Sequence, residues 1–188
     1  TDTAASLAPT VGAITLEDIK APECFYIEKK LRERMKIPVF HDDQHGTAII
    51  SAAGLVNGLK VVGKDIDKVK LVCSGAGAAA IACLDVMISV GLLRENIYVC
   101  DSKGVIYVGR EANMEPTKAR YAQKTDARTL NDVIEGADVF LGLSTAGVLK
   151  PEMVMKMADK PLIFALANPN PEILPADAMA VRPDCVIA

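Results

Sequence analysis

The chain has 188 residues, a formal net charge of −3 and 51% hydrophobic residues, enough for one sizeable domain with a buried core. It contains no block of like charges and no apolar run long enough to span a bilayer, so we expect neither a nucleic-acid nor a membrane partner. Aromatic residues are scarce and small aliphatic ones plentiful, a composition typical of buried parallel strands covered by closely packed helices.

The leading part of the chain, residues 1–62, reads as a helical segment around a polar cluster. Residues 1–13 show little periodicity and are expected to form a linker or a frayed start of the chain. Apolar residues recur at roughly helical spacing over 22–35, and Pro22 suits a first helical turn. An apolar stretch at 37–40 then leads into HisAspAspGlnHis (41–45), and residues 47–62 have helical character that ends near Gly63.

The second part, residues 63–188, alternates between strand-like and helix-like segments. Strands are expected at 69–73, 96–100, 138–143, 162–167 and 185–188, and helices at 77–90, 116–123, 130–135, 151–158 and 175–181. This alternation predicts an α/β fold with a doubly wound, Rossmann-like parallel sheet. Because the chain begins with Thr and ends in a strand-like segment, we expect it to be a piece of a longer protein whose nucleotide domain is truncated at the C-terminus.

The five cysteines (24, 73, 83, 100 and 185) are odd in number, lack CxxC spacing and lie among apolar residues. We expect buried free thiols and therefore a reducing, cytoplasmic location.

A glycine-rich loop follows the strand predicted at 69–73. Gly75, Gly77 and Ala80 form Gly-x-Gly-x-x-Ala between that strand and a helix. The first glycine permits a tight turn, the second lets the backbone approach a pyrophosphate, and the small third residue lets the helix pack on the strand. The free N–H groups at the helix N-terminus favour phosphate. The sequence therefore predicts dinucleotide binding, with a purely structural turn as the alternative.

Asp101 closes the next strand, 21 positions after Ala80, where a carboxylate can bind a ribose hydroxyl. Lys103 could neutralise a 2′-phosphate, whereas Asp101 would repel one unless it turned away. A solvated surface lysine is the other interpretation of Lys103. NADP is therefore modestly favoured, and NAD stays open.

Two short segments flanking the first predicted helix carry paired carboxylates, Glu17–Asp18 and Asp42–Asp43. Hard oxygen ligands of this kind suit Mg²⁺ or Mn²⁺. Adjacent acids also mark solvated helix starts, where they favour the dipole. The chain has two histidines, which we expect to hydrogen-bond the acids or a substrate-side loop.

Five motifs in order resemble the bacterial malic enzymes, particularly the NADP-dependent kind. They are LeuGluAspIleLysAlaProGluCysPhe (16–25), IleProValPheHisAspAspGlnHisGlyThrAla (37–48), SerGlyAlaGlyAlaAla (74–79), CysAspSerLysGly (100–104) and AlaAsnProAsnProGlu (167–172). The resemblance covers nearly the whole chain, and the first two motifs are highly specific. It implies oxidation of malate by hydride transfer to NADP⁺ or NAD⁺, followed by loss of CO₂ to leave pyruvate.

The resemblance also implies roles for individual residues. It makes Glu17, Asp18 and Asp43 ligands of a divalent cation, with Asp42 beside them in the catalytic network. It places residues 76–79 (Ala76, Gly77, Ala78 and Ala79) at the cofactor phosphates and Asn168 against substrate and nicotinamide.

The chain departs from the family pattern by omission. In the family, a general-acid tyrosine and a general-base lysine lie upstream of the motif at residues 16–19, in a region that this sequence does not contain. An Asn-rich segment that follows the terminal strand in the family is also missing here. None of the four tyrosines here sits in the matching motif. We therefore expect the activity to belong to the intact protein and this piece alone to turn over malate poorly.

Two rival interpretations stay open. A Rossmann dehydrogenase with a metal-independent mechanism would explain residues 70–104 but leave the four acids without a role. A non-catalytic dinucleotide-binding or oligomerisation module would bury those acids at a subunit contact. A homo-oligomer is expected, because a truncated chain exposes apolar surface.

Overall fold

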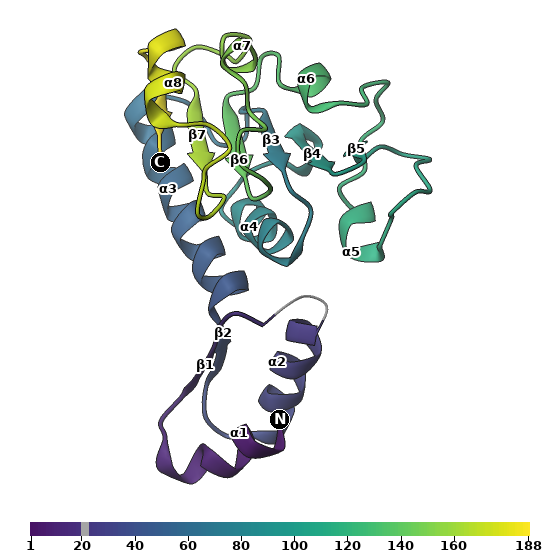
Figure 1. The fold of residues 1–188 in the computed structure, drawn as a ribbon, viewed down its shortest axis with the longest axis vertical. Coiled ribbons are helices and arrows are strands. Elements are labelled where there is room, and N and C mark those ends of the chain that lie inside the picture. The colour runs from purple at the N-terminus through teal and green to yellow at the C-terminus, as the bar shows by residue number, and fades with distance from the viewer. Residues whose placement is uncertain (20–22) are drawn as a thin grey trace.

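The computed structural model describes residues 1–19 and 23–188. The molecule is elongated, with a small lobe formed by the residues before α3 at one end and a larger α/β body at the other (Figure 1). Helix α3 (Thr47–Val62) connects the two, since its first turn leaves the small lobe and its remainder lies on the body.

The small lobe contains α1 (Asp2–Leu7), a 3-10 turn (Ala8–Thr10), β1 (Ile14–Leu16), α2 (Glu23–Arg34) and β2 (Val39–His41). The prediction of a linker or frayed start at 1–13 was wrong, because residues 2–7 form a helix. The helix predicted at 22–35 is confirmed over 23–34, while Pro22 lies outside the described residues. Strands β1 and β2 pair in parallel, which the sequence did not reveal, and Leu16, Leu31, Met35 and Val39 form their core.

Helix α3 is confirmed with the bounds that the periodicity predicted. A π-helical turn at Asp42–Gly46 precedes it, and Gly63 ends it in the left-handed conformation, with φ +73°. Its buried residues, including Leu55 and Leu59, pack into the core of the body.

The body is built on one six-stranded sheet in the order β5-β4-β3-β6-β7-β8. The strands are β3 (Leu71–Ser74), β4 (Ile97–Asp101), β5 (Gly104–Val105), β6 (Val139–Gly142), β7 (Leu162–Ala165) and β8 (Val186–Ile187). All neighbours pair in parallel except β4 and β5, which are antiparallel. The predicted doubly wound parallel sheet is therefore confirmed, with the short β5 as an unpredicted edge.

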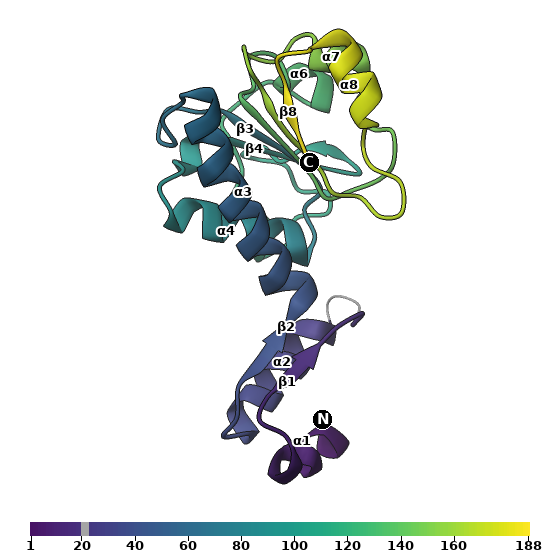
Figure 2. The same ribbon diagram turned by 90° about the vertical axis from the view of Figure 1, so that its left-hand side faces the viewer.

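Helices cover both faces of this sheet. Figure 2 shows α3 and α4 (Ala78–Ser89) on one face, and α6 (Leu130–Val133), α7 (Pro151–Val154) and α8 (Pro175–Val181) on the other. Alternate residues of one strand join different cores: Leu71 and Cys73 face α3 and α4, whereas Val72 faces the other layer. Burial on both faces explains why the strands are continuous apolar runs.

Two predicted helices are four residues shorter than expected, and α4 and α6 are each two residues shorter. Residues 116–123 form α5 only over Pro116–Ala119, because Tyr121 turns into the core and Gln123 N–H donates to Ile106 O. Residues 151–158 form α7 only over 151–154. The chain continues from both helices in local turns until a long-range bond ends them, from Gln123 N–H after α5 and from Ala158 N–H to Ala137 O after α7.

All five cysteines are free, and Cys24, Cys73, Cys83 and Cys100 are buried, as predicted; Cys185 is half-buried. Burial raises the pKa of the Cys83 thiol to about 11 and that of Cys100 to about 12, which keeps both thiols protonated and unreactive. Within residues 1–19 and 23–188, no helix combines the length and apolarity needed to cross a membrane.

Candidate active site

The two acidic pairs directly follow the C-terminal ends of β1 and β2, which are neighbouring strands. In the parallel pair β1–β2, Leu16 is in register with His41. Glu17–Asp18 and Asp42–Asp43 therefore follow the same edge of this small sheet. The convergence that the sequence left open is set by the strand pairing.

One contact joins the two pairs directly. The backbone N–H of Asp18 donates a hydrogen bond to Oδ2 of Asp43, 3.0 Å away. Asp18 has φ +56°, a left-handed conformation that aspartate tolerates better than most residues, and its strained turn aims its N–H at Asp43. The Glu17 and Asp18 residues are exposed. Across the described ranges 1–19 and 23–188, no group of three or more His, Cys, Asp or Glu side chains is close enough to hold a metal ion.

Asp42 and Asp43 lie in the π-helical turn that starts α3. π-Helical turns often occur at functional sites. Gly46 closes the turn, and a side chain at this position would overlap the Asp42 carboxylate. The glycine therefore leaves room for Asp42 to fold back over the turn.

The two histidines differ in their surroundings. His41 is 1% exposed, and neither of its ring nitrogens has a hydrogen-bond partner within the described residues. Its Nε2 lies 3.9 Å from Asp43 Oδ2, beyond hydrogen-bond range. His45 Nε2 contacts Glu28 Oε1 at 2.8 Å and so ties α2 to the start of α3. The expected histidine–acid hydrogen bond occurs at His45, with an acid that the sequence did not single out.

The glycine loop has the geometry that dinucleotide binding requires. Gly75 has φ +118°, and a Cβ there would overlap the carbonyl oxygen of Leu143. Gly77 is the residue before α4, and the space around its missing side chain is open. Ala80 is 1% exposed, where the helix packs on the sheet. The turn, the open approach and the close packing thus fall at the three predicted positions.

Asp101, at the end of β4, is enclosed by donors. Arg110 Nη2 contacts both carboxylate oxygens at 2.7 Å, Lys118 Nζ contacts Oδ2 at 3.2 Å, and Asn113 Nδ2 contacts Oδ2 at 3.1 Å. The Lys103 backbone N–H donates to Oδ1 at 2.8 Å. Burial alone would raise the pKa of Asp101, but the bonds from Arg110, Lys103 N–H and Lys118 outweigh it and hold the pKa below the usual value.

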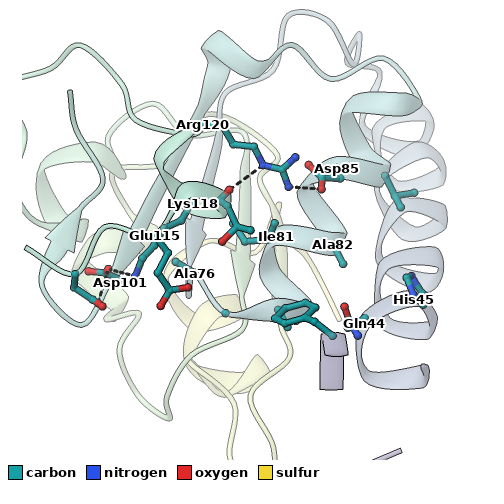
Figure 3. Close-up of a pocket in the computed structure, with 16 residues that line it drawn as sticks. Gln44, His45, Ala76, Ile81, Ala82, Asp85, Asp101, Glu115, Lys118 and Arg120 are labelled. Atoms are coloured by element: carbon teal, nitrogen blue, oxygen red, sulfur yellow. Dashed lines mark hydrogen bonds and ion pairs between the residues drawn. The ribbon is translucent and has the colours of Figure 1, made fainter. Parts of the chain in front are cut away.

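The glycine loop, Asp101 and the start of α3 border one cavity of about 640 Å³ (Figure 3). Its lining residues are Phe25, Gln44, His45, Ala76, Gly77, Ala78, Ile81, Ala82, Asp85, Val86, Asp101, Asn113, Glu115, Thr117, Lys118 and Arg120. Arg120 reaches across its rim and pairs with Asp85 of α4 at 2.5 Å. The cavity therefore extends from the predicted ribose site to the HisAspAspGlnHis segment.

Other predicted residues lie outside this lining. Lys103 is exposed, and its backbone rather than its side chain contacts Asp101. Asn168 is exposed in the loop after β7, and Asp42 and Asp43 lie beside Gln44 without lining the cavity themselves.

Comparison with known proteins decides the family. The family model described as "Malic enzyme, NAD binding domain" matches residues 44–187. The chain belongs to the malic enzyme family. It is 67% identical over 184 residues to the NADP-dependent malic enzyme of Escherichia coli, and 63% identical over 186 residues to an NAD-dependent malic enzyme of Rhizobium meliloti. These matches cover 97% and 99% of the chain but 24% of each relative, so the chain spans about a quarter of their length.

A solved malic enzyme shares the fold. The crystal structure of an NAD-dependent malic enzyme from Thermotoga maritima aligns with a TM-score of 0.90 and 40% identity, covering 100% of this chain and 50% of that one. The doubly wound, Rossmann-like fold predicted from the alternation of strands and helices is thus confirmed by a malic enzyme structure.

Sequence reasoning missed four residues that shape this candidate site. They are Glu28, which binds His45; Arg110 and Lys118, which hold Asp101; and the buried Glu172, which accepts from the backbone of Ser144 and Ala167. Arg110 and Lys118 are only 8% and 6% exposed, an unusual degree of burial for cations. Neither had a local sequence signal, because Arg110 and Lys118 follow Asp101 by 9 and 17 residues and reach it only through the fold.

Proposed function

We propose that the intact protein containing this chain oxidises and decarboxylates malate to pyruvate and CO₂ with reduction of NADP⁺, NAD⁺ being the alternative cofactor. One observation carries this proposal. A single cavity borders both the glycine loop and the HisAspAspGlnHis segment that starts α3. A dinucleotide lying along the loop would therefore extend toward the acidic pairs.

The cofactor half of the site consists of Gly75, Ala76, Gly77, Ala78 and Ala79. Gly77 and the residues after it present the free N–H groups of a helix N-terminus, together with its partial positive charge, to a pyrophosphate.

Asp101 is proposed to bind the ribose, with Lys118 and Arg110 offsetting its charge. That neutralisation supports NADP, because an unpaired aspartate would repel a 2′-phosphate. Lys103 stays a proposed partner of the phosphate from the exposed side.

Glu17, Asp18 and Asp43 are the proposed ligands of Mg²⁺ or Mn²⁺. The hydrogen bond from Asp18 N–H to Asp43 supports this set, because it brings the two acidic segments into contact. Carboxylate oxygens are the donors that these cations prefer. When bound there, the cation would polarise the carbonyl formed by oxidation and stabilise the enolate left by decarboxylation.

Two further residues, Asp42 and Asn168, complete the proposed site. Asp42 is proposed to belong to the catalytic network beside the ligands, oriented by the π-helical turn that Gly46 permits. Asn168 is proposed to contact substrate and nicotinamide from the loop after β7.

The organisation of the molecule follows the same proposal. We place the metal-binding segment at residues 1–62 and the cofactor domain at 63–188, with α3 packed on the latter as the connection. A homo-oligomer in the cytoplasm is proposed, in keeping with five free cysteines. Light scattering of the purified protein measures the assembly.

The deciding experiment measures NADPH formation by the intact protein with malate and NADP⁺, with and without Mn²⁺, together with a titration of NADPH fluorescence. We expect turnover that requires the metal. Turnover that survives complete chelation would instead establish a metal-independent dehydrogenase. NADPH binding that neither Mn²⁺ nor malate alters, with no turnover, would establish a binding module.

A further inference from the structure

Glu172 is a fully buried carboxylate beyond the carboxyl ends of the parallel strands, where cofactors bind in folds of this kind. It is 0% exposed and follows β7 by a short loop. Burying a carboxylate is costly unless hydrogen bonds replace the lost water. A side chain in this position therefore calls for an explanation.

The hydrogen bonds of Glu172 join two separate loops. Its Oε1 accepts from the backbone N–H of Ser144 at 2.8 Å and from the Ser144 hydroxyl at 3.3 Å, after β6. Its Oε2 accepts from the backbone N–H of Ala167 at 3.0 Å, after β7. One carboxylate thus sets the distance between these loops.

The end of β6 leaves space for the Glu172 carboxylate. Gly142 ends β6, and a Cβ at this position would overlap the carboxyl group of Glu172. Gly142 is therefore required for space, since its missing side chain is where the carboxylate lies.

The network continues to the glycine loop. Ser144 Oγ lies 2.8 Å from Ser74 Oγ, the last residue of β3, and Leu143 N–H donates to Ser74 O at 2.8 Å. Strands β3 and β6 are neighbours from which the chain runs outward in opposite directions, so their carboxyl ends form the topological switch point. In open α/β sheets, ligands bind in the crevice at that point.

We propose that Glu172 is a positioning residue of the cofactor crevice, which fixes the loops after β6 and β7 at the separation that seats the nicotinamide half of the dinucleotide. This inference rests on the function proposed above and adds a residue that does not itself touch the cofactor. Asn168 follows Ala167 directly, so the bond to Ala167 N–H holds the backbone from which Asn168 projects. The adenosine half lies at Asp101, on the far side of the glycine loop, and does not depend on Glu172.

The test compares two probes on Glu172→Gln: NADPH, and adenosine 2′,5′-bisphosphate, which lacks the nicotinamide. Glutamine keeps the shape but presents an NH₂ group to one of the two loop N–H donors, so one arm of the bridge is lost. The affinity for NADPH is expected to fall roughly ten-fold, while that for the bisphosphate changes less than about two-fold. Glu152→Gln on the exposed face of α7 is the control, with both affinities unchanged.

Two further variants keep the proposal open to refutation. Ser144→Ala removes the hydroxyl, with its contacts to Glu172 and Ser74, and leaves both backbone bonds to Glu172. The NADPH affinity is therefore expected to fall about three-fold, and the bisphosphate affinity is expected to stay unchanged. This variant decides the question if Glu172→Gln does not fold. Gly142→Ala displaces the carboxylate without altering it and is expected to reproduce the effect of Glu172→Gln.

Equal losses for the two probes would show that Glu172 serves general stability, and unchanged NADPH binding in the variants would also overturn the proposal. Failure of the wild-type protein to bind either probe would instead remove the cofactor site itself. The two failures are therefore distinguishable.

Discussion

Asp18 and Asp43 meet through a 3.0 Å hydrogen bond from the Asp18 N–H to Asp43 Oδ2, across 25 residues of chain. The parallel pairing of β1 with β2 creates this contact, because Leu16 and His41 are in register immediately before the two acidic pairs. A carboxylate that already accepts one backbone donor keeps its other oxygen for a cation. The hydrogen bond thus fixes the position of the Asp43 carboxylate, one of the proposed metal ligands, relative to the Asp18 backbone.

Asp43→Asn is expected to abolish the effect of Mn²⁺ on NADPH fluorescence in the presence of malate. The amide retains an oxygen for Asp18 N–H but removes the charge that a hard cation requires. Binding of NADPH without metal should stay within about two-fold, because the glycine loop is separate. Asp67→Asn, at an exposed aspartate in the turn that follows α3, is the matched control. A retained Mn²⁺ response in Asp43→Asn would exclude this residue as a ligand.

Gly46→Ala is expected to lower turnover by the intact protein without lowering its stability. The added methyl group would overlap the Asp42 carboxylate, which must rotate away, yet Gly46 has helical dihedral angles that alanine prefers by up to ~1 kcal/mol. Urea unfolding and steady-state kinetics measure the two effects. Gly12→Ala, where nothing lies within 4 Å of the new methyl group, serves as control. Normal turnover in Gly46→Ala would show that the orientation of Asp42 does not matter.

The body of the fold was predictable because its signals are local. Apart from β5 and the C-terminal ends of α5 and α7, the strands and helices of residues 63–188 follow from apolar runs separated by glycine- and proline-marked turns. Helix α3 follows from periodicity that ends at Gly63. By contrast, β1 is three residues long and is stabilised by β2, beyond α2. Helix α1 buries no residue, so it has no apolar pattern to detect.

The candidate site was predictable in its motifs but not in its electrostatics. The glycines of the loop could be recognised from the sequence, because positions such as Gly75 have no room for a side chain and only glycine fits there. Lys118 could not be assigned, because its contact with Asp101 depends on the turn at α5 rather than on local spacing. The same holds for Glu172, whose bonds reach Ser144, 28 residues earlier.

The stability of the protein is expected to depend on Asp101 at acidic pH. Its pKa is lowered below the usual 3.8, so its stabilising contribution is complete above the unfolded-state pKa and is lost as the pH falls through the folded-state pKa. The difference in unfolding free energy between wild type and Asp101→Asn should be constant above about pH 5 and shrink below it. Urea denaturation across that range measures it. If the difference in unfolding free energy grew as the pH fell, it would contradict the lowered pKa that the bonds from Arg110 and Lys118 give Asp101.

Lys118→Gln is expected to shift cofactor preference from NADP toward NAD. Lys118 is 6% exposed, lines the cavity and contacts Asp101 at 3.2 Å, so its loss removes a cation near the ribose and leaves Asp101 less neutralised. Both changes disfavour a 2′-phosphate, whereas NAD lacks that group and gains a freer aspartate acceptor. The KM for NADP⁺ should rise roughly ten-fold or more, while that for NAD⁺ changes less than about three-fold. Lys124→Gln, at an exposed lysine beyond α5, controls for the loss of one positive charge. A parallel rise for both cofactors would show that Lys118 only supports the loop, and it would leave Lys103 to account for any preference for the phosphate.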